Sequence, residues 1–143
     1  MDIAKLIECR PSSDIVTCDV EAAVRNVVAL LDARRIGALP VMKAGEVVGI
    51  FSERDVIHRL ASEGSACMDR VVGEVMTSPA ITVERQTKVD DALALMTRRR
   101  IRHLPVLDGT TMCGFVSIGD LVKSQIDEIK NEAAQMRQYI TTA

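Results

Sequence analysis

The fold is decided by Ile36-Gly37-Ala38-Leu39-Pro40-Val41 and by its second copy 65 residues later, Ile101-Arg102-His103-Leu104-Pro105-Val106. Each copy follows an apolar-periodic stretch that ends in arginines, and each precedes a second apolar run. That run reaches a glycine, then a serine, then an aspartate, which are Gly49, Ser52, Asp55 in the first copy and Gly114, Ser117, Asp120 in the second. The pattern predicts one structural unit written twice.

The duplication extends well beyond the Pro-Val pairs. Subtracting 65 from any position between 81 and 122 gives its partner without a gap. Several pairs are identical, among them Thr17/Thr82, Val24/Val89, Leu30/Leu95, Arg34/Arg99 and Arg35/Arg100. Where the copies differ, one apolar residue usually replaces another, as Phe115 replaces Ile50. A gapless shift that preserves both identity and polarity indicates an internal repeat.

Hydrophobic periodicity predicts a β-α-β-β-α unit in each copy. For the first copy we expect a helix over 2–8, a strand over 15–17, a helix over 21–35, strands over 38–42 and 47–51, and a helix over 53–62. For the second we expect a helix over 71–76, a strand over 80–83, a helix over 89–99, strands over 102–107 and 112–116, and a helix from 117. One such unit is too small to bury its own core. The prediction is therefore an α+β fold of two repeats packed with pseudo-two-fold symmetry around two clefts.

The repeats divide the chain into three parts. Residues 1–70 form the first repeat with its N-terminal helix and linker, residues 71–125 the second repeat, and residues 126–143 a C-terminal helical extension. Along the last helix, apolar residues alternate at spacings of four and three: Val122, Ile126, Ile129, Ala133, Met136 and Ile140. This heptad pattern covers either the chain's own sheet or a second subunit. We favour a homodimer, because the first copy has no corresponding extension.

Composition excludes several functional classes. With 48% hydrophobic and 27% charged residues among 143, the chain is not intrinsically disordered. A net charge of −2 and 2% aromatic residues disfavour nucleic-acid binding, which relies on basic surfaces and aromatic stacking. No apolar stretch reaches the ~20 residues of a membrane span, and the N-terminus lacks a signal-peptide pattern. We expect a cytoplasmic protein without membrane contacts.

The sequence predicts neither a metal site nor a catalytic centre. Cys9, Cys18, Cys67 and Cys113 are irregularly spaced without C-x-x-C, which indicates buried reduced thiols. Nucleophile-elbow, zinc-protease, P-loop and Rossmann motifs are all missing from the sequence. We therefore predict no catalytic residues and no enzyme.

The Ser-x-x-Asp pairs Ser52/Asp55 and Ser117/Asp120 allow two interpretations. The first is purely structural, because a serine followed three residues later by an acid is a capping box. The second is a ligand site, because each pair lies where a strand turns into a helix whose free N–H groups attract anions. The aspartate would then accept hydrogen bonds from a ribose diol. Gly119 would let the ligand approach the backbone.

Arginines form the one dense positive cluster of the sequence. A solvated helix end accounts for Arg98 and Arg99. Arg102 and His103 head the strand that leads to Pro105, and a basic group there would neutralise phosphate. The first copy has the neutral residues Gly37-Ala38 instead, with Arg54 as its phosphate partner. We expect two unequal clefts, the more phosphate-friendly one beside Pro105.

The repeated stretches 36–41 and 101–106, each followed by Gly-x-x-Ser-x-x-Asp, resemble a tandem pair of CBS domains (a Bateman module) of the stand-alone prokaryotic type. The resemblance covers roughly residues 1–125. It implies a regulatory sensor that binds AMP, ADP, ATP, S-adenosylmethionine or NAD(H) between the repeats, often as a disc-shaped dimer. It further implies that the aspartates contact ribose and that the serines lie near phosphate. The resulting candidate nucleotide-binding residues are Thr17, Ile36, Gly37, Ala38, Pro40, Ser52, Arg54, Asp55, Thr82, Arg102, His103, Pro105, Ser117, Gly119 and Asp120.

The leading hypothesis is a homodimeric, non-enzymatic adenine-nucleotide-binding module that senses energy or redox state and acts on a separate partner protein. The alternative is a structural or protein-interaction module with degenerate pockets, which the capping boxes and the heptad pattern favour. Nucleic-acid binding through Arg98–Arg102 is a third hypothesis, which the acidic pI of 5.7 weakens. An enzyme acting on a bound nucleotide fits least well.

Overall fold

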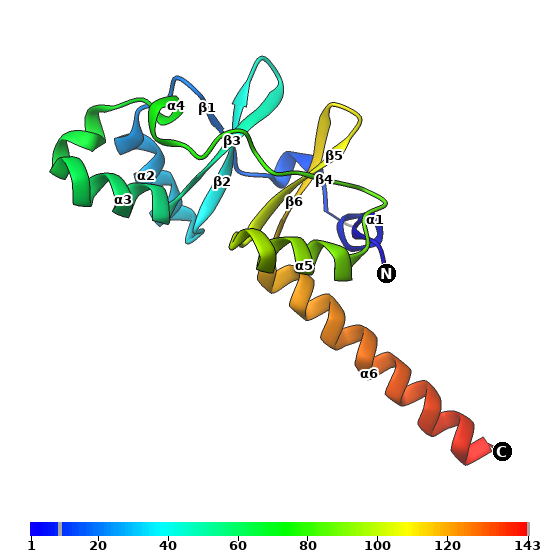
Figure 1. Ribbon diagram of the computed structural model, residues 1–143. Helices are drawn as coiled ribbons and strands as arrows, with labels where there is room; N and C mark the ends of the chain where they lie inside the picture. Colours follow the sequence, from blue (N-terminus) through cyan, green and yellow to red (C-terminus); the bar gives the residue numbers. More distant parts are fainter. Residues whose placement is uncertain (9, 143) are drawn as a thin grey trace.

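The computed structural model describes residues 1–8 and 10–142, and it contains two three-stranded sheets built alike (Figure 1). In each sheet the first strand is parallel to the second, and the second and third form an antiparallel hairpin. The strands are β1 (Cys18–Asp19), β2 (Ala38–Lys43), β3 (Glu46–Ser52), β4 (Val83–Glu84), β5 (His103–Asp108) and β6 (Thr111–Ser117). The predicted α+β fold and its duplication are confirmed.

Strand register follows the 65-residue shift. Pro40 faces Ile50 in the first hairpin, and Pro105 faces Phe115 in the second. Both hairpins carry a bulge directly after the valine of the Pro-Val pair, between Val41 and Met42 in the first and between Val106 and Leu107 in the second. The duplication therefore extends from the residue pattern to the hydrogen-bond ladder.

The helices are α1 (Ile3–Ile7), α2 (Val24–Arg34), α3 (Glu53–Glu63), α4 (Val72–Val75), α5 (Val89–Arg99) and α6 (Ile118–Thr142), with 3₁₀ turns at 12–14 and 64–69. Helices α2 and α5 both end on an arginine in the left-handed conformation, Arg35 with φ 53° and Arg100 with φ 55°. Glycine usually takes this position. The sharp turn directs residues 36–38 and 101–103 away from their helices and into the space between the repeats.

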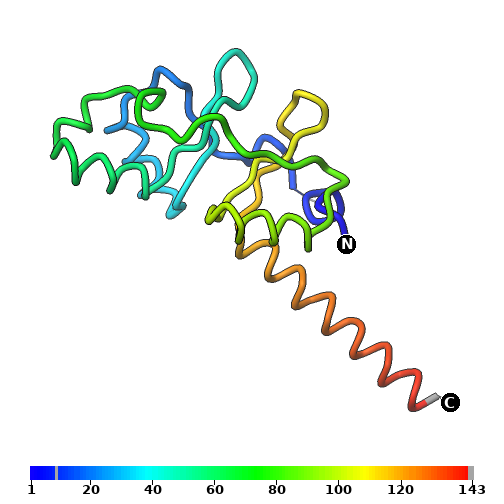
Figure 2. Tube along the Cα trace, viewed as in Figure 1, coloured from blue at the N-terminus to red at the C-terminus, as the bar shows by residue number. Residues whose placement is uncertain are grey.

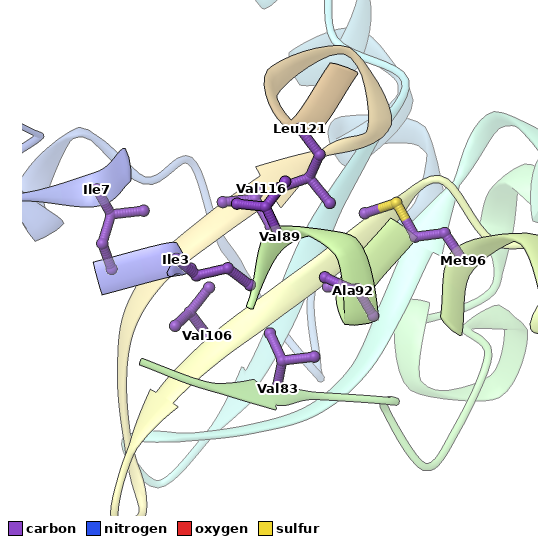
Figure 3. Close-up of a cluster of buried hydrophobic side chains, with 10 residues drawn as sticks. Ile3, Ile7, Val83, Val89, Ala92, Met96, Val106, Val116 and Leu121 are labelled. Carbon is purple, nitrogen blue, oxygen red and sulfur yellow. The ribbon is translucent and has the colours of Figure 1, made fainter. Parts of the chain in front are cut away.

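Each repeat has its own apolar core, and short helices are exchanged between them. The second core contains Ile3 and Ile7 of α1 together with Val89, Leu104 and Leu121 (Figure 3). The first core contains Val72 and Val75 of α4, packed with residues of α2, β2 and β3. Backbone hydrogen bonds fix both exchanges, Ile3 N–H to Thr87 O and Val72 N–H to Ala22 O. Packing thus crosses the predicted boundary at 70/71, while the division of the chain itself stays a prediction.

The predicted strands over 15–17 and 80–83 were placed too early. The structure pairs Cys18–Asp19 and Val83–Glu84 instead. Residues 15–16 and 80–81 leave the sheet and line the clefts between the repeats, so their apolar side chains cover a cavity rather than a sheet. The last helix, α6, runs on past the second repeat and extends away from the body of the molecule (Figure 2).

The cysteines only partly match the prediction of buried thiols. Cys67 is fully buried, whereas Cys18 and Cys113 are half-buried, and all three are free thiols. Burial, assisted by the neighbouring carboxylate of Asp19, raises the pKa of Cys18 to about 11. Cys9 lies outside the described residues.

Candidate functional site

Two clefts lie between the repeats, and each takes its walls from both. The Asp55 cleft has a volume of about 560 Å³. Residues 52–55 at the start of α3 form its first wall, and residues 99–103 of the second repeat form the opposite wall. Thr77 and residues 79–81, which lie between α4 and β4, also line the cleft, as do Gly37, Ala38, Ile50 and Ile57. The volume lies in the range of small-molecule sites.

The Asp120 cleft has a volume of about 430 Å³ and is built the same way with the repeats interchanged. Ser117 and Asp120 at the start of α6 face residues 35–38 of the first repeat. The N-terminal segment, including Arg10 and residues 14–16, occupies the place that residues 77–81 take in the Asp55 cleft. Each cleft therefore combines the Ser-x-x-Asp motif of one repeat with the segment before the proline of the other.

This crossing changes the expected distribution of arginines. Arg54 was predicted to belong to the first copy's site and Arg102 to the other, but both line the Asp55 cleft. Arg54 reaches across the repeats, and its Nη1 donates to the backbone oxygen of Arg100 at 3.1 Å. The cause is the left-handed turn after α5, which projects residues 101–103 toward the first repeat.

The Ser-x-x-Asp motifs form capping boxes in both repeats. Ser52 N–H donates to Asp55 Oδ2 at 2.9 Å, and Asp55 N–H donates to Ser52 Oγ at 3.4 Å. The equivalent bonds between Ser117 and Asp120 measure 2.9 and 3.1 Å. The helix-capping interpretation is thus confirmed. The capping box uses Oδ2 of each aspartate, and Oδ1 makes a separate contact.

The Oδ1 atoms of the two aspartates have chemically different partners. Thr77 Oγ1 donates to Asp55 Oδ1 at 2.8 Å. Arg10 Nη2 donates to Asp120 Oδ1 at 3.1 Å and forms an ion pair with it. Partial burial alone would raise the pKa of Asp120, but the hydrogen bonds from Arg10 and Ser117 together lower it below its ordinary value. Asp120 is therefore ionised at neutral pH.

Net charge distinguishes the clefts further. The Asp55 cleft is lined by four arginines, Arg54, Arg99, Arg100 and Arg102, against the carboxylates of Glu53 and Asp55. The Asp120 cleft is lined by Arg10 and Arg35 against Asp14 and Asp120. The first cleft thus carries an excess of two positive charges, whereas the charges of the second balance. Low-dielectric walls strengthen such a difference for a charged ligand.

His103 is common to both clefts. Its ring stacks on Phe115, with centroids 5.5 Å apart and planes inclined by 12°. Burial, followed by the nearby charge of Arg102, lowers the pKa of His103, while Asp120 and Glu53 oppose the shift. The imidazole is therefore neutral at pH 7. Of the basic pair predicted before Pro105, Arg102 alone supplies positive charge.

Ten of the fifteen predicted site residues line a cleft; the others are Thr17, Pro40, Thr82, Pro105 and Gly119. Both prolines are buried within β2 and β5, where they pair with the neighbouring strand. Gly119 lies exposed in the first turn of α6. Pro40 and Pro105 thus mark the site without forming its surface.

Sequence reasoning missed the segments before the first strand of each repeat. Arg10 and Thr77 are absent from the predicted site residues, yet each donates a hydrogen bond to the motif aspartate of a cleft. Nothing local marks Thr77, since its partner Asp55 lies 22 residues earlier in the chain. Nothing local marks Arg10, since its partner Asp120 lies 110 residues away.

No cluster of three or more His, Cys, Asp or Glu side chains suited to a metal ion occurs among residues 1–8 and 10–142. A search of the same residues for a helix long and apolar enough to cross a bilayer finds none.

The fold and the clefts define a tandem pair of β-α-β-β-α units with two inter-repeat sites. A family model described as CBS domain matches residues 3–62 and 72–127, which are the two repeats. The chain belongs to the CBS-domain family.

Similar proteins support this assignment. The chain is 38% identical over 128 residues to the CBS domain-containing protein CBSX3, mitochondrial, of Arabidopsis thaliana, a match that covers 86% of this chain and 62% of that relative's length. The CBS-domain containing protein ATU1752 from Agrobacterium tumefaciens has a similar structure (TM-score 0.81, 31% identity, 87% of this chain and 99% of that chain covered). CBSX2 from Arabidopsis thaliana, solved in complex with AMP, shares the fold at 22% identity (TM-score 0.79, 90% and 98% covered).

Proposed function

We propose that this CBS-domain pair is a regulatory module that binds an adenine nucleotide between its repeats. The observation that carries the proposal is the Asp55 cleft, where the carboxylate of Asp55 and four arginines face a single cavity. A carboxylate at a helix start accepts hydrogen bonds from a ribose diol, and arginines bind phosphate oxygens in a bidentate manner. The AMP complex of the structurally similar CBSX2 supports the same ligand class.

Ligand choice follows from charge in this proposal. The arginine-rich Asp55 cleft takes a nucleotide with several phosphates, such as ADP, ATP or NAD(H). The charge-balanced Asp120 cleft takes a ligand with less negative charge, such as AMP or S-adenosylmethionine. The site beside Pro105 keeps its predicted preference for phosphate, but the Ser-x-x-Asp motif that completes it belongs to the first repeat.

The module acts without catalysis of its own and reports energy or redox state to a separate cytoplasmic partner protein. This part of the proposal is supported by the absence of catalytic sequence motifs and by the stand-alone CBS-domain relatives. Ligand binding changes the contacts between repeats, because each cleft is formed by residues from both. Through such a change, a bound nucleotide would favour one conformation of the module and so alter its effect on a partner protein.

Isothermal titration of the full chain with AMP, ATP and NADH tests the proposal. We expect binding by the wild type and a loss on the order of 10-fold or more in the Asp55→Asn/Asp120→Asn double variant, because hydrogen bonds to a charged acceptor are lost. Asparagine keeps the helix caps, so folding is retained. Asp32→Asn, at an exposed position of α2, is the matched control.

Two results would overturn the nucleotide proposal. One is the absence of binding by the wild type, which would favour an interaction module whose serines and aspartates serve only as caps. The other is unchanged affinity in the double variant.

A further inference from the structure

We propose that the C-terminal part of α6 pairs in parallel with the same helix of a second copy of this chain. The pairing surface is the α6 seam, defined as Val122, Ile126, Ile129, Ala133, Met136 and Ile140. This inference is independent of the nucleotide proposal. It assigns an interface and an orientation that follow from the extension alone, most of which lies beyond the family match ending at residue 127.

The seam is left uncovered by its own chain. Contacts of α6 with the body lie near its start, where Leu121 is buried and Ser124 and Gln125 bond to Met1 and Asp90. From Ile129 to Thr141 every described residue is exposed, and Ile129, Met136 and Ile140 are exposed by 63, 66 and 71%. Figure 1 shows this part of α6 projecting from the molecule. An isolated helix with such an apolar stripe gains stability only by burying it.

The seam has the geometry of a helix pair. Its residues alternate at four and three, an average of 3.5 per turn, which keeps a narrow stripe facing one partner helix. A helix lying on a membrane has instead a broader apolar face and a cationic polar face. Residues 118–142 contain four acidic and three basic side chains, so attraction to anionic lipid is weak. A second copy supplies an identical stripe and fits the seam without any other requirement.

Charges beside the seam select the parallel orientation. Ile126, Ala133 and Ile140 take heptad position a, and Val122, Ile129 and Met136 take position d. The flanking e positions are then Lys123, Lys130 and Arg137, and the flanking g positions are Gln125, Glu132 and Tyr139.

In a parallel pair each g residue faces the e residue five positions later on the partner helix. Glu132 then meets the partner's Arg137, and Gln125 meets the partner's Lys130. In an antiparallel pair e faces e, which brings the three basic residues of each helix together. The sequence of the extension therefore favours the parallel pair.

Pairing of α6 would connect the contact between subunits to the Asp120 cleft. Asp120 lies in the first turn of α6 and lines the Asp120 cleft, and the seam begins at Val122 on the same helix. One continuous helix thus runs from a cleft wall to the partner contact.

Disulfide crosslinking of the full chain tests both pairing and orientation. Ile140→Cys lies on the seam near the far end of α6, whereas Asn131→Cys lies at position f on the opposite face. Under mild oxidation at low protein concentration we expect several-fold more covalent dimer for Ile140→Cys than for Asn131→Cys or the wild type. The wild type measures the background from its native thiols. Equal yields would overturn the pairing, and preferential crosslinking of Ile140→Cys to Val122→Cys in a mixture would overturn the orientation.

A charge exchange provides the second test. Glu132→Lys places like charges opposite Arg137 of the partner subunit and should weaken the dimer several-fold in sedimentation experiments. Adding Arg137→Glu should restore it. Tighter association in Arg137→Glu alone would indicate the antiparallel pair and overturn the proposal. So would a wild type that remains monomeric yet co-sediments with phosphatidylglycerol vesicles.

Discussion

The two clefts share one scaffold but differ in the residues that enter them. Both repeats have the same hairpin register and the same capping box. In both, the helix before the hairpin (α2 or α5) ends on an arginine in the left-handed conformation. Residues 99–102 line only the Asp55 cleft and residues 35–36 only the Asp120 cleft, whereas Gly37, Ala38 and His103 border both. Thr77 holds one motif aspartate, whereas Arg10 holds the other. After the duplication, the residues that build each cleft stayed the same in both repeats, whereas the residues that a ligand would contact diverged.

The largest expected effect tests whether the two scaffolds are equivalent. Leu39 and Leu104 are fully buried at corresponding positions of β2 and β5. Truncation of either to alanine should lower the free energy of unfolding by about 3 kcal/mol, because both leave a cavity in a close-packed core. Urea denaturation measures the loss, and Leu60→Ala, at a partly exposed position, serves as the control. A cost below about 1 kcal/mol in only one repeat would show that the cores are not equivalent.

A smaller asymmetry is expected at the paired glycines Gly49 and Gly114. A Cβ on Gly49 would lie 2.8 Å from the backbone oxygen of Thr77, which cannot move without disturbing its hydrogen bond from the Ile50 N–H. A Cβ on Gly114 would lie 3.0 Å from the flexible end of Ile7. Gly49→Ala should therefore cost about 1–3 kcal/mol and Gly114→Ala clearly less, because overpacking against backbone is relieved with difficulty. Thermal unfolding of both variants measures this difference, and equal costs would contradict it.

The next prediction concerns charge, and it depends on nucleotide binding. Arg102→Ala should weaken ATP binding on the order of 10-fold, since a charge-assisted phosphate contact is lost from the Asp55 cleft. The loss should be smaller for AMP, which carries fewer phosphates. Arg35→Ala, in the Asp120 cleft, is the matched control for ATP. Titration calorimetry of the wild type and both variants with ATP and AMP gives the affinities. An equal effect of both substitutions on ATP would remove the proposed division of ligands between clefts.

The fold was largely predictable, because the periodic apolar residues and the exact repeat determine which strands pair. The helix over 89–99 was predicted with the bounds that the structure has. Arg10 and Thr77 were not predictable, because their hydrogen bonds join residues far apart in the chain. The location of Arg102 was also missed, since a strand pattern gives the direction of a side chain but not which repeat it faces. Local sequence thus defined the motif aspartates and their capping serines, whereas the partners of Oδ1, Thr77 and Arg10, come from tertiary structure.

The smallest expected effect separates the partners of the two aspartates. Arg10→Ala removes the ion pair with Asp120 and should lower the free energy of unfolding by about 0.5–1 kcal/mol at neutral pH, as for other partly exposed pairs. Thr77→Val removes an uncharged donor from Asp55 and should cost a similar amount. Salt should reduce the first effect and leave the second unchanged, because only the first is an interaction between charges. Denaturant unfolding at low and high ionic strength distinguishes them, and equal salt dependence would contradict the assignment.

Acid provides an independent check on the Arg10 ion pair. The pKa of Asp120 is lower in the folded chain than its ordinary value of 3.8, since the hydrogen bonds from Arg10 and Ser117 outweigh the opposing effect of burial. A carboxyl group with a lowered folded pKa stabilises the fold fully above its unfolded pKa, and this contribution is lost as pH falls through the folded pKa. The stability difference between wild type and Arg10→Ala should therefore be constant well above pH 3.8 and decline as the pH falls below that value. Arg35→Ala, which lines the same cleft without bonding to Asp120, should show no such decline. A difference that persists undiminished at low pH would mean that Arg10 stabilises the fold through packing of its aliphatic stem rather than through its charge.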